Sequence, residues 1–236
     1  TMAPGDTQEV VVAEIVAGAI PGVDRISAIG LLKFYDRQAQ VAYDNNFDLP
    51  VPPPVPNVTV VGSEDGPLNG VYYSLDNKIV LNWGTDPANY LATENSNSKG
   101  YVFEGYNVYQ LPNASASVSE GKRIATYDVA NGVGKIEDLV FDINTGSVVK
   151  LPVQFGNDSG IKRYLEITGD VFNNGEPLIN GIRYYYAVTA YNFNPDPQVV
   201  PNNLENPIQI LTIIPQSNTP GYEFGEEQGS TLTVTH

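Results

Sequence analysis

The sequence predicts an all-β protein, and three observations lead to that expectation. The chain of 236 residues contains 22 glycines and 18 prolines, a composition typical of many strands joined by turns. It also contains 15 tyrosines, a residue that favours sheets and recognition surfaces. Short segments of alternating apolar and polar residues recur between turn residues along most of the chain.

Residues 1–49 predict an N-terminal arm made of one strand and one helix. The β-branched run Glu9–Val16 is typical of a strand, and the segment that follows it offers no obvious pairing partner. The opening residues Thr1–Asp6 have neither the charged nor the apolar region of a signal peptide. We therefore expect the chain to be a piece of a longer protein.

The helix of this arm is predicted over Asp24–Tyr43, with Asp24 as its N-cap. Its apolar residues recur at helical spacing, namely at Ile26, Ile29, Leu32, Ala39 and Ala42 or Tyr43. We expect an amphipathic helix that lies with this apolar side on a sheet.

Residues 50–56 read Pro-Val-Pro-Pro-Pro-Val-Pro and predict a linker. Proline rings fix φ and supply no backbone donor, so the segment must be extended and polyproline-like. We expect it to hold the arm at a set distance from the rest of the chain.

Residues 57–215 predict a β domain, and residues 216–236 a loop-like tail with a short strand at Ser230–Thr235. The strands of the domain are expected at Asn57–Val61, Lys78–Trp83, Phe103–Gln110, Lys122–Val129, Lys135–Phe141, Val148–Phe155, Lys162–Thr168, Arg183–Tyr191 and Ile208–Ile214. Asn, Asp, Gly and Pro residues between them supply the turns.

Alternation within these strands predicts which side chains share an interior. Such an interior, between two layers of antiparallel sheet, is how a β-sandwich is assembled. The predicted structural core consists of Leu81, Trp83, Tyr106, Val108, Tyr184, Tyr186 and Val188.

These residues resemble those of a fibronectin type III domain, an immunoglobulin-like β-sandwich. The similar segments are Pro56–Val60, Leu81–Trp83, Gly105–Tyr109, Leu178–Tyr184 and Ala187–Asn192. The resemblance implies a tyrosine corner, in which the Tyr184 hydroxyl bonds back to the upstream turn. Asn180 stands where the family has proline, and much of 128–177 exceeds the family pattern, so we expect an inserted β region there.

The wider layout is similar to the C-terminal part of large surface-exported bacterial proteins that use a type IX secretion-like route. The similar features are the Pro-Gly-Asp-Thr-Gln-Glu-Val-Val-Val strand, the helix, the proline bridge and Phe103–Tyr109. This second resemblance implies an extracellular or cell-surface location and names no activity.

The charge of the chain bears on its partners. With 27 acidic and 12 basic residues the formal net charge is −15, so the chain should repel nucleic acid and anionic lipid. No stretch approaches the roughly 20 apolar residues of a membrane-spanning helix, and we expect no membrane insertion.

The sequence offers little for catalysis. It has no cysteine and a single histidine, His236, which is the last residue. Nucleophile–histidine arrangements and thiolate metal sites are therefore excluded, and phosphate-binding glycine motifs are absent. We predict no catalytic residue, no organic cofactor and no enzymatic activity.

Calcium is the one ion for which the sequence offers ligands. Asp44, Asn46 and Asp48 place several oxygen atoms in one short loop, and calcium prefers oxygen ligands. The spacing is not that of an EF-hand, and a solvated turn accounts for the same residues equally well.

Three aromatic residues point away from the predicted core. Tyr109, Tyr185 and Tyr191 should lie on the outward side of neighbouring strands. An aromatic stripe there is either covered by the helix or the insertion, or offered to a ligand such as a polysaccharide.

The N-terminal run Glu9, Val10, Val11, Val12 and Ile15 is a candidate assembly strand. Either it folds back onto its own sandwich, or it completes the sheet of a neighbouring copy. Repeated head to tail, such donation makes a filament.

The sequence thus predicts a non-catalytic extracellular structural or adhesive module, whose partners are copies of itself or neighbouring domains of a longer surface protein. The alternatives are a carbohydrate-binding accessory module and a fragment of an enzyme whose catalytic part lies elsewhere.

Overall fold

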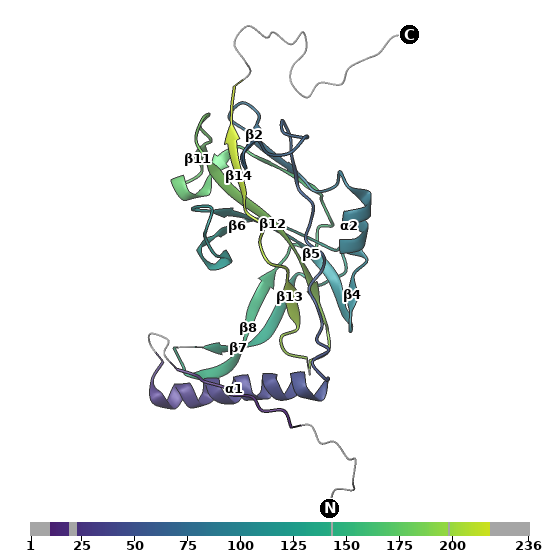
Figure 1. Ribbon diagram of the computed structural model, residues 1–236, viewed down its shortest axis with the longest axis vertical. Coiled ribbons are helices and arrows are strands. Elements are labelled where there is room, and N and C mark those ends of the chain that lie inside the picture. Colours follow the sequence, from purple (N-terminus) through teal and green to yellow (C-terminus); the bar gives the residue numbers. More distant parts are fainter. Residues whose placement is uncertain (1–9, 19–22, 143, 198, 218–236) are drawn as a thin grey trace, which may run out of the picture.

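The computed structural model describes residues 10–18, 23–142, 144–197 and 199–217, and most of its regular structure is β. Figure 1 shows the sheets stacked above a long helix at one end of the molecule. The helices are α1 (Arg25–Asp44) and α2 (Pro87–Glu94), with single turns of 3-10 helix at η1 (Val118–Glu120) and η2 (Val171–Asn173).

The strands form sheets of unequal size. They are β1 (Thr59–Val60), β2 (Tyr72–Ser74), β3 (Ile79–Asn82), β4 (Asn97–Ser98), β5 (Tyr101–Leu111), β6 (Lys122–Asp128), β7 (Lys135–Asp142), β8 (Ser147–Phe155), β9 (Tyr164–Ile167), β10 (Gly169–Asp170), β11 (Glu176–Pro177), β12 (Tyr184–Phe193), β13 (Asn203–Glu205) and β14 (Leu211–Pro215). Each predicted strand of the domain is present, with ends no more than three residues from the expected ones.

Two sheets contribute side chains to one interior. The first has three strands in the order β1-β3-β9, and the second has seven, with the path β2-β14-β12-β5-β4 and with β6 on β5 and β13 on β12. All pairs are antiparallel except β2 with β14. The pairs β7–β8 and β10–β11 form separate two-stranded sheets.

The main core consists mainly of side chains from these two sheets. All seven predicted core residues belong to one buried cluster, together with Val60, Ile79, Phe103, Ile167, Leu178, Ala190 and Ile213. Trp83 is 1% exposed, and its ring lies 5.8 Å from that of Tyr106 and 6.0 Å from that of Tyr127. The Tyr184 hydroxyl accepts a hydrogen bond from Ile179 N at 3.0 Å, as expected of a tyrosine corner.

Part of the expected insertion belongs to the core instead. β9 lies within residues 128–177, yet it pairs with β3 over its whole length and contributes Ile167 to the buried cluster. The β7–β8 hairpin is the true protruding part of this region (Figure 1).

One helix and the shortest strands of the structure were not predicted from the sequence. α2 begins at Pro87, and Asp86 caps it by accepting hydrogen bonds from Ala88 N and Asn89 N. An aspartate followed by proline is a helix-start signal that was present in the sequence. The missed strands β2, β4, β10, β11 and β13 have two or three residues each, too few for alternation to show.

The proline segment 50–56 is not a free spacer. Its backbone carbonyls accept hydrogen bonds from side chains of the domain, from Asn192 to Val51, Asn206 to Pro53, Thr93 to Pro54 and Asn89 to Val55. These bonds fix the segment along the body instead of letting it hold the arm at a distance.

Two expectations fall outside the described residues: the strand at Ser230–Thr235 and the position of His236. Among the helices that are described, none has both the length and the apolar character needed to cross a bilayer.

Candidate functional site

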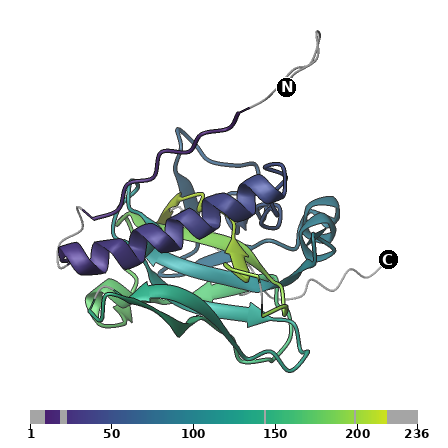
Figure 2. The ribbon, with the colours of Figure 1, turned by 90° about the horizontal axis from the view of Figure 1, so that it is seen from below.

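The N-terminal residues 10–18, called here the valine segment, lie outside every sheet of the described structure. They are extended and run back along α1 (Figures 1 and 2). Val10, Val12 and Val16 are each about four-fifths exposed, and Val11 is 45% exposed. Ile15 is half-buried, and Glu9 lies outside the described residues. The candidate assembly strand therefore has its valines open to solvent.

α1 begins as predicted, because the Asp24 side chain accepts hydrogen bonds from Ile26 N at 3.0 Å and Ser27 N at 2.7 Å. These bonds lower the pKa of the Asp24 carboxyl, since the ionised carboxylate is the better acceptor. The helix lies across the β7–β8 hairpin at the end of the molecule (Figure 2).

Two glycines allow α1 to approach the hairpin turn. A Cβ on Gly30 would lie 3.0 Å from the carbonyl oxygen of Gly146, and one on Gly146 would lie 2.0 Å from Ser27 Oγ. Gly146 also has a φ of +65°, a conformation that favours glycine. Packing thus explains why a glycine, a poor helix former, stands at position 30 within α1.

α1 lies on a sheet as predicted, the β7–β8 hairpin, but mostly not with the predicted apolar side. Leu31 is the residue of α1 that is buried, whereas Ile26 is 73% and Ile29 50% exposed. Leu32 and Tyr43 are exposed as well, and of the predicted side only Ala39 and Ala42 are half-buried. The predicted side was wrong because α1 has apolar residues on two sides, and periodicity does not say which side meets the hairpin. An apolar stripe is left in solvent.

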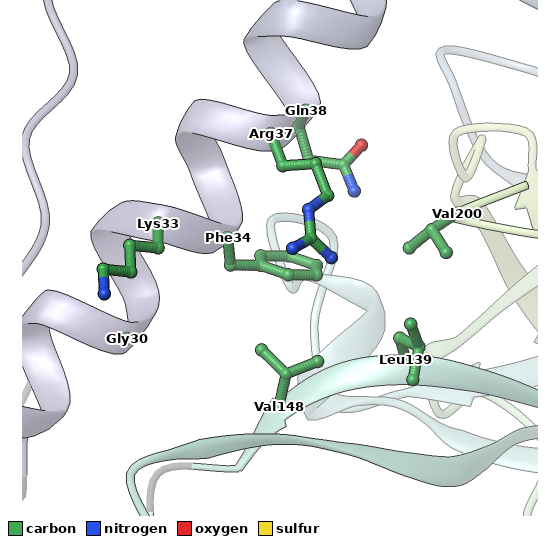
Figure 3. A pocket seen from close by; sticks show the side chains of 8 residues that line it. All are labelled: Gly30, Lys33, Phe34, Arg37, Gln38, Leu139, Val148 and Val200. Atoms are coloured by element: carbon green, nitrogen blue, oxygen red, sulfur yellow. The ribbon is translucent and has the colours of Figure 1, made fainter. Parts of the chain in front are cut away.

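The packing of α1 on the hairpin leaves a cleft of about 180 Å³. Figure 3 shows Phe34 and Arg37 facing Leu139 and Val148 across it. Its lining is mainly apolar and comes from Gly30, Lys33, Phe34, Arg37, Gln38, Leu139, Val148 and Val200.

α1 carries exposed charges of both signs. Arg25, Lys33 and Arg37 are exposed, and no salt bridge joins them to the residues that the structure describes. Asp36 and Asp44 are exposed on the same helix, so three basic and two acidic residues give it a net charge of +1, whereas the whole chain carries −15. Lys33 and Arg37 also line the cleft.

Two of the three outward aromatic residues are buried, which corrects the ligand-facing interpretation. Tyr109 is 7% and Tyr191 1% exposed. Tyr185 is half-buried and packs with Tyr109 in a second apolar cluster that includes Ile208 and Ile210. Of the two alternatives, the stripe is covered, in part by β8 of the expected insertion and in part by residues 205–210, and not by α1.

The cover is held by polar groups that the sequence analysis did not identify. Asn107 of β5 is fully buried and donates to Gln154 Oε1 of β8 at 3.2 Å and to Glu205 Oε1 of β13 at 3.0 Å. Gln154 Nε2 donates in return to Asn107 Oδ1 at 3.0 Å. Arg123 also donates to Gln154, at 2.7 Å. We call this side of β5 and β12 the outer face.

Glu205 anchors the other end of this network. The hydroxyls of Tyr109 and Thr189 both donate to its carboxylate. Burial, and then the charge of Glu205, raise the pKa of Tyr109. Tyr109 therefore stays a neutral donor at ordinary pH.

A half-buried ion pair between Arg163 and Glu94 was also not predicted from the sequence. Arg163 Nε and Nη2 donate to the Glu94 carboxylate at 2.7 and 2.6 Å, and the Tyr106 hydroxyl donates to the same group at 2.9 Å. Because Arg163 and Glu94 are far apart in the chain, no local sequence pattern predicts that they pair. The group ties α2 to the core.

The candidate calcium ligands do not converge. Asp48 pairs with Lys99, and Asp44 accepts a hydrogen bond from Gln40 at 2.8 Å. Asn46 has a φ of +52° in the turn after α1. Among the described residues, no group of three or more His, Cys, Asp or Glu side chains is placed to hold a metal ion.

A larger groove lies between β7 and residues 193–202, with a volume of about 450 Å³. It combines Phe193, two prolines and two valines with a polar rim of Lys135, Lys150, Glu137, Asp138 and Asn202. Both lysines pair with Glu137. Sequence alternation could not reveal it, because it joins segments distant in the chain.

Comparison of the chain with protein-family models, with curated proteins and with solved structures found no match.

Proposed function

We propose that this chain is a non-catalytic extracellular structural module, which assembles by donating its valine segment to the sheet of a second copy. The observation that carries the proposal is the exposure of Val10, Val12 and Val16 on a segment with no ladder partner among the described residues. An extended apolar segment is stabilised when its valines are buried and its backbone groups are hydrogen-bonded.

We infer a fibronectin type III-like sandwich for the body of this module. The strand orders β1-β3-β9 and β6-β5-β12-β14, the buried Trp83 and the hydrogen bond from Ile179 to Tyr184 support that reading. Such a body is a rigid unit that carries binding elements on its edges.

Charge favours α1 as the side of the chain that meets the second copy. α1, beside the valine segment, has a net charge of +1 from Arg25, Lys33 and Arg37 against Asp36 and Asp44, whereas the chain as a whole carries −15. The acidic body of another copy is therefore repelled less by α1 than by the rest of the chain. In the described sheets β9 pairs only with β3, so its outer edge is one that a strand can extend. β8 is a poorer acceptor, because Pro152 lacks an N–H group.

The test is electron microscopy and sedimentation of the wild-type chain, of a variant lacking Thr1–Ala17, and of the double variant Val10→Asp, Val12→Asp. We expect assemblies from the wild type only, with unchanged circular dichroism in the variants. Leu68→Asp, at a residue that is 64% exposed elsewhere, is the control and should assemble normally. Wild-type particles that are compact monomers, or polymers that persist after the deletion, would show the proposal to be wrong.

A second candidate function is carbohydrate binding by the groove beside β7. Its apolar floor with Phe193 and its polar rim suit the two kinds of surface on a sugar ring. Binding of soluble polysaccharide that is lost in Phe193→Ala, but kept in Tyr109→Phe, would favour this function over assembly.

A further inference from the structure

Two irregular connecting segments join the β7–β8 hairpin to the body. Two side-chain carboxylates bind these segments to each other and to β6. Asp158 Oδ1, in the returning chain, accepts from Asn131 N at 2.7 Å and Gly132 N at 2.9 Å, both in the outgoing chain. Asp128, at the end of β6, accepts from Asn157 N at 3.3 Å and from Asp158 N at 3.0 Å. Both connections are thus fixed by side-chain carboxylates.

Glu104 of β5 lies in the same place and is 4% exposed. Its Oε2 accepts a hydrogen bond from Asn131 Nδ2 at 3.0 Å, and its Oε1 is buried without a partner. A buried carboxylate oxygen without a donor is costly while it carries charge. Protonation removes that cost.

The charges that face Glu104 are negative. Asp128 and Asp158 are its charged neighbours, and no ion pair joins Glu104 to a basic side chain among the described residues. Tyr191 of β12 lies nearby and is kept neutral, because burial raises its pKa, as do Asp128 and Glu104. Burial first, and then the two aspartates, raise the pKa of Glu104 to about 7.

We propose that Glu104, Asp128 and Asp158 form a pH-dependent clasp, which holds the hairpin on the sheet while Glu104 is protonated and loosens when Glu104 ionises. Ionisation places a third negative charge beside two carboxylates that are already bound to backbone N–H groups. The repulsion acts on the connecting segments 129–134 and 156–160. Through the second segment it also acts on Gln154 of β8, which covers the outer face. This regulation goes beyond the proposed assembly and does not depend on it.

The geometry favours a proton over a bound cation in this cluster. Both oxygens of Asp128 and Oδ1 of Asp158 already accept backbone hydrogen bonds. A Cβ on Gly156 would lie 1.8 Å from Asp128 Oδ2, so the backbone packs closely against that oxygen. In the part of the chain that the structure describes, no three or more His, Cys, Asp or Glu side chains are grouped so as to hold a metal ion.

The experiment is hydrogen exchange of the full chain between pH 5.5 and 8.5, corrected for intrinsic exchange rates, with wild type and Glu104→Gln. We expect protection of residues 129–134 and 156–160 to fall at least about tenfold more in the wild type than in the variant. Protection of β3 should change equally in both. Glu176→Gln, at an exposed carboxyl of β11, is the matched control and should behave as the wild type.

Carbon NMR of the Glu104 carboxyl in the wild type gives an independent reading that needs no variant. A titration midpoint near 7 supports the clasp, and one below about 5 overturns it. Equal loss of protection in wild type and Glu104→Gln overturns it too. So does restoration of wild-type protection by calcium at pH 8.5, which would identify a cation site.

Discussion

On the inner side of the β5–β12 sheet, Tyr106, Val108 and Val188 pack among apolar side chains from the three-stranded sheet. On its outer side Asn107 and Tyr109 are just as well covered, but their polar groups bind carboxylates and amides, although the ring of Tyr109 also packs in the second apolar cluster. The inner face is stabilised by area and close packing, which are tolerant of sequence change of similar volume. The outer face depends on individual hydrogen bonds that must all be made. The two faces should therefore respond to different perturbations.

The largest effect is expected on the inner face. Trp83→Ala removes the biggest buried side chain of the core and should lower the free energy of unfolding by about 3–5 kcal/mol. Urea denaturation followed by circular dichroism measures the loss, since the chain has no other tryptophan. A loss below about 1 kcal/mol would mean that the two sheets do not share this interior.

The second effect concerns pH at the edge of the outer face. The pKa of Glu104 is about 7 in the folded chain and near 4.5 in an unfolded one, so the folded state binds this proton more tightly. Its contribution to stability is complete below pH 4.5 and is lost as the pH rises through 7, by about 3 kcal/mol. The measurement is the urea concentration at the unfolding midpoint, for wild type and Glu104→Gln, at pH 5.5 and at pH 8. This midpoint should fall less between the two pH values in the variant than in the wild type.

A smaller loss is expected from the polar network itself. Asn107→Ala removes its hydrogen bonds to Gln154 and Glu205, which keep Arg123 and the Tyr109 and Thr189 hydroxyls as partners, and should cost about 2 kcal/mol. Gln154→Ala should be less harmful once Asn107 is gone, because the two residues share hydrogen bonds. A double-mutant cycle measures this coupling, and strict additivity would contradict the network.

The smallest effect is expected at the tyrosine corner. Tyr184→Phe keeps the buried ring and removes the acceptor for Ile179 N, at a cost of about 1 kcal/mol. Thermal unfolding monitored by circular dichroism is sensitive enough. Tyr185→Phe, whose residue is half-buried on the opposite side of the same strand, is the control and should lose less.

Alternation in the sequence was enough to place the inner face. Leu81, Tyr106 and Tyr186 lie in strands long enough to show a period of two, and Trp83 directly follows one of them. Apolar residues on one side of a strand are buried. The same alternation placed Tyr109 and Tyr191 on the outer side, but it does not tell whether a face is covered. The cover comes from Gln154 and Glu205, whose partners are decided by the tertiary fold.

The candidate assembly surface was predicted only in part. The β-branched run around Val10–Val12 was found from its composition, and its exposure could not be. The side of α1 that is exposed was predicted to be the packed side. A helix with apolar residues on two sides does not show by its periodicity which of the two is buried. What decided the packed side was the close approach of Gly30 to Gly146, a contact between distant parts of the chain.

The proline segment has a mechanical consequence for a protein that is pulled from its N-terminal side. Its carbonyls are tied to Asn192 of β12 and Asn206 just beyond β13, and its rings leave little slack to extend. Tension on α1 would therefore be transmitted directly to β12, the middle strand of the largest sheet, without first extending a slack linker.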